Sequence, residues 1–184
     1  MKSENKIIKA IKSEILMFLR DPIPYVYMYT YSNKKIVDIR PYNPMTTQLG
    51  LDIKNKINSL FPELRVHFLG SAALKIAGQL DVDIFVECDK KHFNKYIPAF
   101  TKLFGEPSKK RNKFIMWEFK KNDIDVQLLL VDQTSRILKR PLKGFADLSK
   151  HTEEYQLLKL RSVGCTHREY EKRKIKFLRE KKLV

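Results

Sequence analysis

Cysteine, glycine and long apolar runs are scarce in this sequence. Its two cysteines, Cys88 and Cys165, lie far apart without a Cys-x-x-Cys motif. This excludes a disulfide scaffold and a cysteine zinc finger, and it suits a reducing compartment such as the cytoplasm. The six glycines are scattered, so no collagen-like or linker-like stretch exists. The longest apolar runs, such as residues 15–19 and 128–131, are far shorter than the roughly 18 residues of a membrane span, and we expect no membrane partner.

Several common catalytic motifs are also missing. No Gly-x-Ser-x-Gly, Gly-x-Gly-x-x-Gly, Walker-type loop or His-Glu-x-x-His occurs. Hydrolase, dehydrogenase and P-loop hypotheses therefore lack support. The four histidines do not have the spacing of metal ligands and are interpreted as surface or packing residues: His67, His92, His151 and His167.

Basic residues outnumber acidic ones by a wide margin. The 184 residues include 37 Lys and Arg against 21 Asp and Glu, which gives a net charge of +16. A field of this sign attracts nucleotides, RNA, DNA and acidic membranes. The alternative is a well-solvated surface encoded by an AT-rich genome that favours lysine. The chain is 43% hydrophobic, which is enough to bury a core and excludes disorder as its main state.

We expect an appendage, residues 1–35, followed by a domain, residues 36–184. The appendage holds a helix over 3–19 and a tyrosine-rich segment over 25–31, whose alternating tyrosines bury one face of a strand or stack on bases. The domain has predicted helices at 45–60, 71–76, 90–104, 152–162 and 167–182, and predicted strands at 36–40, 64–69, 81–87, 113–119 and 124–131. This order predicts an α/β (α+β) fold, with helices packed on a mixed sheet and two closing helices.

A Gly-Ser pair ends the predicted strand at 64–69. Gly70 lets the backbone approach a ligand closely, and Ser71 places a hydroxyl and backbone N–H groups at the start of a helix. Such a turn is suited to phosphate, although Gly-Ser before a helix is also common as a simple cap.

Two carboxylates lie on one face of the next strand. Asp81 and Asp83 alternate with Val82 and Ile84, so the acids project together while the valine and isoleucine point into the core. Two neighbouring carboxylates repel each other unless a cation lies between them, and Mg²⁺ prefers such oxygen ligands. The structural alternative is that Asp81 caps the strand and Asp83 forms a salt bridge with a lysine.

A third acid, Asp125, lies on a later apolar strand. From an adjacent strand it could complete a two-metal site or accept the proton of an attacking hydroxyl. The alternative is an edge-strand charge that prevents aggregation. Asp123, two residues earlier, is interpreted as part of a hairpin turn after Lys120 and Lys121.

Together these residues resemble the nucleotidyltransferase superfamily, which has the polymerase-β-like fold and a pattern of Gly-Ser, Asp-x-Asp and a third Asp. The matching residues are Gly70, Ser71, Asp81, Asp83 and Asp125. Over its length the chain is most similar to the GrpB family within this superfamily. The supporting stretches are residues 39–44, the Gly70-Ser71 turn, 154–159 and 168–170, within a likeness that spans about 36–182.

The chain also departs from the GrpB pattern. Phe68 stands where that family usually has His, with His67 one position earlier. Leu80-Asp81 replaces a frequent Lys-Pro, and Asp125 replaces a His. These differences move toward the catalytically complete pattern of the superfamily and favour an active transferase.

The resemblance implies attack of a hydroxyl on the α-phosphate of a nucleoside triphosphate (NTP), with release of pyrophosphate. Asp81, Asp83 and Asp125 would be catalytic and hold Mg²⁺ or Mn²⁺, with Asp125 next to the attacking oxygen. Gly70 and Ser71 would bind the β- and γ-phosphates. Lys75, one helical turn after Ser71, could also reach a phosphate or simply face solvent.

The acceptor hydroxyl stays open between RNA or tRNA, a protein and a small molecule. Basic residues flank the third acid, which suits a phosphate backbone. They are found at residues 109–113, 120–121, 136–143 and 168–179. One alternative is a non-catalytic GrpB-like module that binds nucleotides or nucleic acid. Another is a toxin-like protein that modifies tRNA or a second protein.

Overall fold

The computed structural model describes residues 33–181 and 183. The helix predicted at 3–19 and the tyrosine segment at 25–31 lie outside the described residues, and the division at residue 35 stays a prediction. Within the described part, contacts separate two compact units. One holds residues 38–163 with residue 183, and the other holds residues 33–37 and 164–181.

The larger unit contains a five-stranded mixed sheet with the order β1-β2-β5-β4-β3. The strands are β1 (Arg65–Leu69), β2 (Asp81–Cys88), β3 (Lys109–Arg111), β4 (Phe114–Lys121) and β5 (Ile124–Asp132). Only the β2–β5 pair is parallel. This mixed α/β arrangement confirms the predicted fold class.

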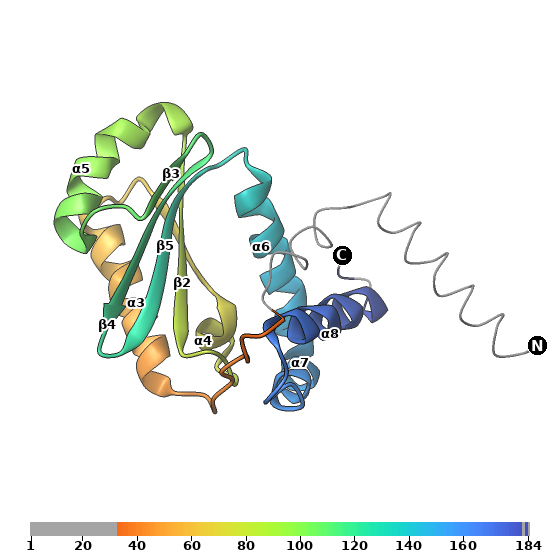
Figure 1. The fold of residues 1–184 in the computed structure, drawn as a ribbon. Helices are drawn as coiled ribbons and strands as arrows, with labels where there is room; N and C mark the ends of the chain where they lie inside the picture. Colours follow the sequence, from red (N-terminus) through yellow and green to blue (C-terminus); the bar gives the residue numbers. More distant parts are fainter. Residues whose placement is uncertain (1–32, 182, 184) are drawn as a thin grey trace, which may run out of the picture. The chain divides into compact units, whose positions relative to one another are not determined.

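Helices cover both faces of the sheet. The helices of the larger unit are α3 (Pro44–Leu60), α4 (Gly70–Leu74), α5 (Phe93–Phe104), α6 (Arg136–Leu148) and α7 (Thr152–Leu160), with short 3₁₀ turns at Lys90–His92 and Ser149–His151. Figure 1 shows α3 and α5 on one side of the sheet and α6 on the other. Among the described residues, no helix combines the length and the apolar character needed to cross a membrane.

Alternation along the central strands creates two apolar clusters. Val82, Ile84 and Val86 of β2 point toward α3 and α5, together with Trp117 of β4. Phe85 points to the opposite face, where it packs with residues from β1, β5 and α6. A strand has a side-chain period of two, so Asp81 and Asp83 share the face of Phe85. The predicted orientation of the two acids is therefore confirmed.

A two-residue hairpin joins β4 to β5. Lys121 pairs with Ile124, and both loop residues, Asn122 and Asp123, have positive φ angles of 53° and 60°. Two successive left-handed residues form the turn whose twist suits a tight hairpin. The predicted hairpin is confirmed, and the turn fixes the register of Asp125.

The smaller unit is built around α8 (His167–Glu180). Thr166 caps this helix, and its side chain and that of Glu169 form a reciprocal capping box. Residues 35–37 run beside the start of the helix, where Val37 N–H donates to the Cys165 carbonyl at 2.9 Å.

One sequence prediction needs correction, and one helix was not predicted. The strand predicted at 36–40 is not a strand, because only Ile36 and Arg40 form isolated β-bridges. Helix α6 was not predicted, because Pro141 and Gly144 interrupt the segment. The proline is tolerated because α6 packs on the sheet through Leu138 and its neighbours.

Asp132 anchors the turn that leads from β5 into α6. Its buried carboxylate accepts hydrogen bonds from Lys113 Nζ at 2.7 Å and from the Thr134 backbone N–H at 3.1 Å. The Lys113 ammonium holds the pKa of this carboxyl below its usual value, and the Thr134 bonds act in the same direction. Ser135 then caps α6 by accepting from Ile137 N–H.

We expect Asp132→Asn to destabilise the protein by about 1–3 kcal/mol near neutral pH, since it removes charge-assisted hydrogen bonds. The pKa is lowered on folding, so the advantage of the native chain is present above pH ~4 and shrinks as the pH falls through the folded pKa. Urea unfolding of both proteins from pH 7 to pH 3 measures this. If the stability difference between the two proteins did not change with pH, the ionised Asp132 carboxylate would not be the group that stabilises the fold.

Candidate active site

The Gly-Ser turn lies where β1 ends and α4 begins. Gly70 has a φ of +80°, and a side chain there would strike a carboxylate oxygen of Asp83. Asp83 is also the register partner of Leu69 on β1. Only glycine combines this backbone angle with this close approach, so the turn and the acid are fitted to each other.

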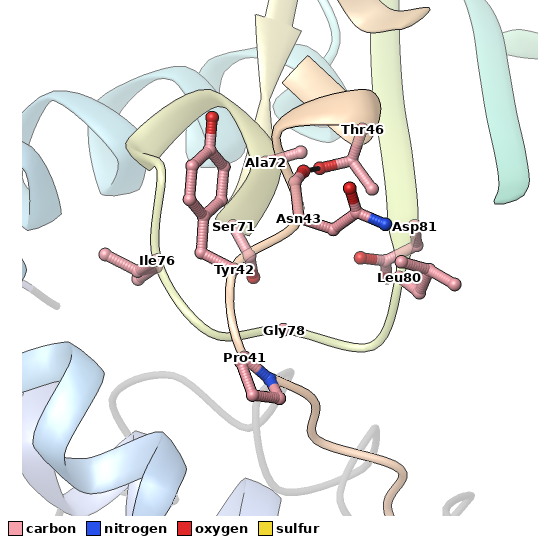
Figure 2. A pocket seen from close by; sticks show the side chains of 10 residues that line it. All are labelled: Pro41, Tyr42, Asn43, Thr46, Ser71, Ala72, Ile76, Gly78, Leu80 and Asp81. Atoms are coloured by element: carbon pink, nitrogen blue, oxygen red, sulfur yellow. Dashed lines mark hydrogen bonds between the residues drawn. The ribbon is translucent and has the colours of Figure 1, made fainter. Parts of the chain in front are cut away.

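Ser71 lies close against the segment that carries Gly78. A side chain on Gly78 would come within 2.6 Å of Ser71 Cβ. Gly78 is itself fixed by two backbone hydrogen bonds with Arg40, at 2.8 and 3.0 Å. Figure 2 shows the hollow between these segments, which both Ser71 and Asp81 line. The other lining residues are Pro41, Tyr42, Asn43, Thr46, Ala72, Ile76, Gly78 and Leu80.

Strand register brings the third acid beside the first. Asp81 of β2 pairs with Asp125 of β5, and Asp83 pairs with Gln127. Paired residues on neighbouring strands point to the same face, so all three acids lie on the face that α6 partly covers. Just before Asp81, Leu80 adopts a left-handed φ of 59°, and its carbonyl accepts from Asp125 N–H at 3.3 Å.

Asp125 is more exposed than the acids of β2 and contacts a lysine. Its carboxylate lies 3.5 Å from Lys120 Nζ, and both side chains are largely exposed. Among residues 33–181, no three His, Cys, Asp or Glu side chains form a group that could hold a metal ion. The register therefore aligns the three acids without gathering their carboxylates into a closed cage.

Asp81 and Asp83 nevertheless suit Mg²⁺ chemically. Both offer hard oxygen donors, and the missing side chain of Gly70 lets the Asp83 carboxylate lie close against the Gly-Ser turn. Magnesium is usually held by one or two carboxylates together with waters and substrate phosphates, rather than by an all-protein cage. The donors present fit that mode of binding.

A lysine from α7 contacts the Gly-Ser turn. Lys159 Nζ donates to Ser71 Oγ at 2.5 Å and lies 5.1 Å from the centre of the Tyr155 ring. The lysine is only 4% exposed, which is unusual for this residue type. Residues 154–159 belong to the stretches that resemble the GrpB family, but no local sequence pattern singles out Lys159, because its contact with Ser71 spans 88 positions.

Lys75, which the sequence singled out, is placed differently. It ends α4 as its C-cap with a φ of 57° and is exposed. Its role in phosphate binding stays a prediction.

No protein-family model matches the sequence, and no curated protein matches it. Solved structures do match. The crystal structure of the conserved protein GrpB from Enterococcus faecalis is similar over 67% of this chain and 81% of its own, with a TM-score of 0.56 and 13% sequence identity.

Two RNA-modifying enzymes match at lower scores. A cytoplasmic RNA terminal U-transferase covers 75% of this chain and 41% of its own, at 11% identity and a TM-score of 0.48. Cid1, an RNA terminal uridylyl transferase, covers 75% and 43%, at 12% identity and a TM-score of 0.47. The structural neighbours thus include GrpB and nucleotidyltransferases, and the likeness to GrpB confirms the predicted fold.

Gly70→Ala tests the fit between the turn and Asp83. We expect a loss of about 1–2 kcal/mol in the free energy of unfolding, because alanine is strained at this φ, together with weaker Mg²⁺ binding because Asp83 must move. Thermal unfolding and calorimetric Mg²⁺ titration measure the two effects. Gly144→Ala on α6 is the control, since its position is open and alanine favours a helix. If both variants showed the same unfolding temperature and the same Mg²⁺ affinity, the proposed fit between Gly70 and Asp83 would be wrong.

Proposed function

We propose that this protein is an Mg²⁺-dependent nucleotidyltransferase, which transfers a nucleoside monophosphate from an NTP to a hydroxyl acceptor and releases pyrophosphate. The observation that supports it most strongly is the pairing of Asp81 with Asp125 on the sheet face that also carries Asp83. Three acids from two strands beside a Gly-Ser turn are costly for stability, because like charges repel each other, but they are suited to nucleotidyl transfer.

The triphosphate would bind where Gly70, Ser71 and Lys159 meet. Ser71 offers its hydroxyl, and the first turn of α4 offers backbone N–H groups that have no partner within the helix. Lys159 already contacts Ser71, so a phosphate oxygen at this turn would receive a charge-assisted hydrogen bond from the ammonium. Because α4 has only five residues, the lysine supplies most of the positive charge.

The acids would act on the reacting atoms. Asp81 and Asp83 would hold the divalent ions, which neutralise phosphate charge and lower the pKa of the acceptor hydroxyl when bound. Asp125, once turned from Lys120, would take the proton of that hydroxyl. The acceptor oxygen would then form a bond to the α-phosphorus, and the bond to the bridging oxygen of pyrophosphate would break in line.

Substituting the acids of β2 tests the reaction. We expect Asp81→Asn and Asp83→Asn each to lower turnover at least 100-fold, since each removes a ligand to the ions, while thermal unfolding changes little. The measurement follows α-³²P label from each NTP into total RNA, protein and small molecules in the presence of Mg²⁺.

The matched control is Asp123→Asn, the same chemical change two residues before Asp125. Asparagine is well tolerated at the positive φ of this turn position, so we expect unchanged turnover. The non-catalytic binding module would be favoured by two results together. The native chain would transfer no label into any fraction, and it would bind nucleotide or nucleic acid no differently from the Asp81→Asn variant.

Lys159→Gln tests the triphosphate site. We expect KM for the NTP to rise about 10- to 100-fold with a smaller change in kcat, because a charged hydrogen bond contributes about 1.5–3 kcal/mol. Lys75→Gln is the matched control and should raise KM less than threefold. Steady-state kinetics give both constants, and thermal unfolding checks that the buried site still folds. A larger rise in KM for Lys75→Gln than for Lys159→Gln would indicate that Lys75, and not Lys159, binds the phosphate.

A further inference from the structure

One surface of α6 is strongly and uniformly basic. Between Arg136 and Lys143 the helix carries four cations and no acid, and these cations recur at helical spacing. Arg136, Lys139 and Lys143 are exposed, and none of the three forms an ion pair or side-chain hydrogen bond with another residue of the described chain. The first acid of the helix, Asp147, already contacts Lys150 at 3.8 Å. Within residues 33–181, these three cations therefore neutralise no acid.

The opposite surface of α6 fixes where this basic stripe lies. Leu138, Leu142 and Phe145 pack against Phe85 and Leu129 on the sheet. Phe85 shares a face with Asp83, and Leu129 shares a face with Asp125, by the alternation of β2 and β5. The helix thus packs on the sheet face that carries the three acids, as Figure 1 shows for α6 and the sheet, and its basic stripe is turned away from the sheet.

The edge strand β3 adds two more cations to the same face. Lys109 pairs with Met116, and Arg111 pairs with Phe114. Met116 and Phe114 pack on the cluster that α6 covers, so the side chains of Lys109 and Arg111 also project on that side. Cations from two separate elements therefore border the same sheet face as the three acids, and the register places Lys109 level with Leu129 and Arg111 level with Val131, farther along β5 than Asp125. A small-molecule acceptor would not require charges spread over a helix and a strand.

We propose that this basic border, formed by Arg136, Lys139 and Lys143 of α6 with Lys109 and Arg111 of β3, binds the phosphate backbone of a polynucleotide strand. This inference rests on the proposed function, because it makes the acceptor a terminal hydroxyl of that strand. The α6 stripe rises by about 10 Å over seven residues, a length that matches several phosphates of one strand. A polynucleotide presents negative phosphates repeated along its length, whereas a single nucleotide carries its phosphates at one place.

The test measures binding by the full chain without any nucleotide present. Fluorescence anisotropy is recorded with 20-nucleotide mixed-sequence single strands of RNA and of DNA from 50 to 300 mM salt. We compare the native chain with Arg136→Gln, Lys139→Gln and Lys143→Gln combined. Arg140 is retained because it takes part in another interaction.

We expect the combined variant to bind at least tenfold more weakly at 50 mM salt, and its slope of log K against log salt to be smaller by about 2, since each lost contact removes roughly 0.7 from the slope. The matched control combines Lys54→Gln, Lys56→Gln and Lys102→Gln on α3 and α5, which cover the opposite face. It removes the same net charge and should bind almost as the native chain does.

Equal weakening by both triple variants would overturn the proposal, because net charge alone would then explain binding. An equal loss of affinity for polyglutamate of similar length would also overturn it, since the surface would not distinguish a polynucleotide from any other polyanion. The RNA and DNA arms decide which strand is preferred. Asp81→Asn should keep full affinity. If Asp81→Asn loses turnover while the α6 variant binds and reacts normally, the proposed function stands and the surface assignment fails.

Discussion

The parallel pairing of β2 with β5 is the constraint on which the candidate site depends. It sets Asp81 opposite Asp125, and it holds only because Val82, Ile84, Ile124 and Val126 fill the core on the other face. A slip of one residue would turn the acids inward and the valines outward, at a large cost in apolar burial. The hydrophobic core therefore specifies the alignment of the polar groups.

Around this alignment, the backbone adopts conformations that are uncommon elsewhere. Gly70 has a positive φ beside Asp83, and Leu80 has a positive φ immediately before Asp81. A left-handed leucine is disfavoured because its side chain crowds the backbone, so the surrounding packing must hold it. The lysine of α7, buried against Ser71, adds a polar contact from a third direction. Such strain and polar burial are concentrated at functional sites.

Sequence reasoning predicted the elements that have strong local signals. The hairpin before Asp125, helix α3 and the alternating strand β2 follow from turn chemistry and periodicity, and so did the shared face of the two acids on β2. The sequence could not predict α6, because Pro141 and Gly144 lower the helix propensity of a segment that tertiary packing stabilises. It also could not predict that Lys159 belongs to the site, because this depends on a contact with Ser71 that is distant in the sequence. The contact between Asp125 and Lys120 was missed because a lysine opposite an acid is defined only by register.

The shortness of β3 has a consequence for the behaviour of the protein in solution. This strand lies at the end of the sheet and contains only Lys109, Lys110 and Arg111, all exposed. An outer strand offers unpaired backbone groups to which a second chain could add by continuing the sheet. Three successive cations over so short a length oppose that addition by mutual repulsion between copies, so this end of the sheet is protected against edge-to-edge aggregation.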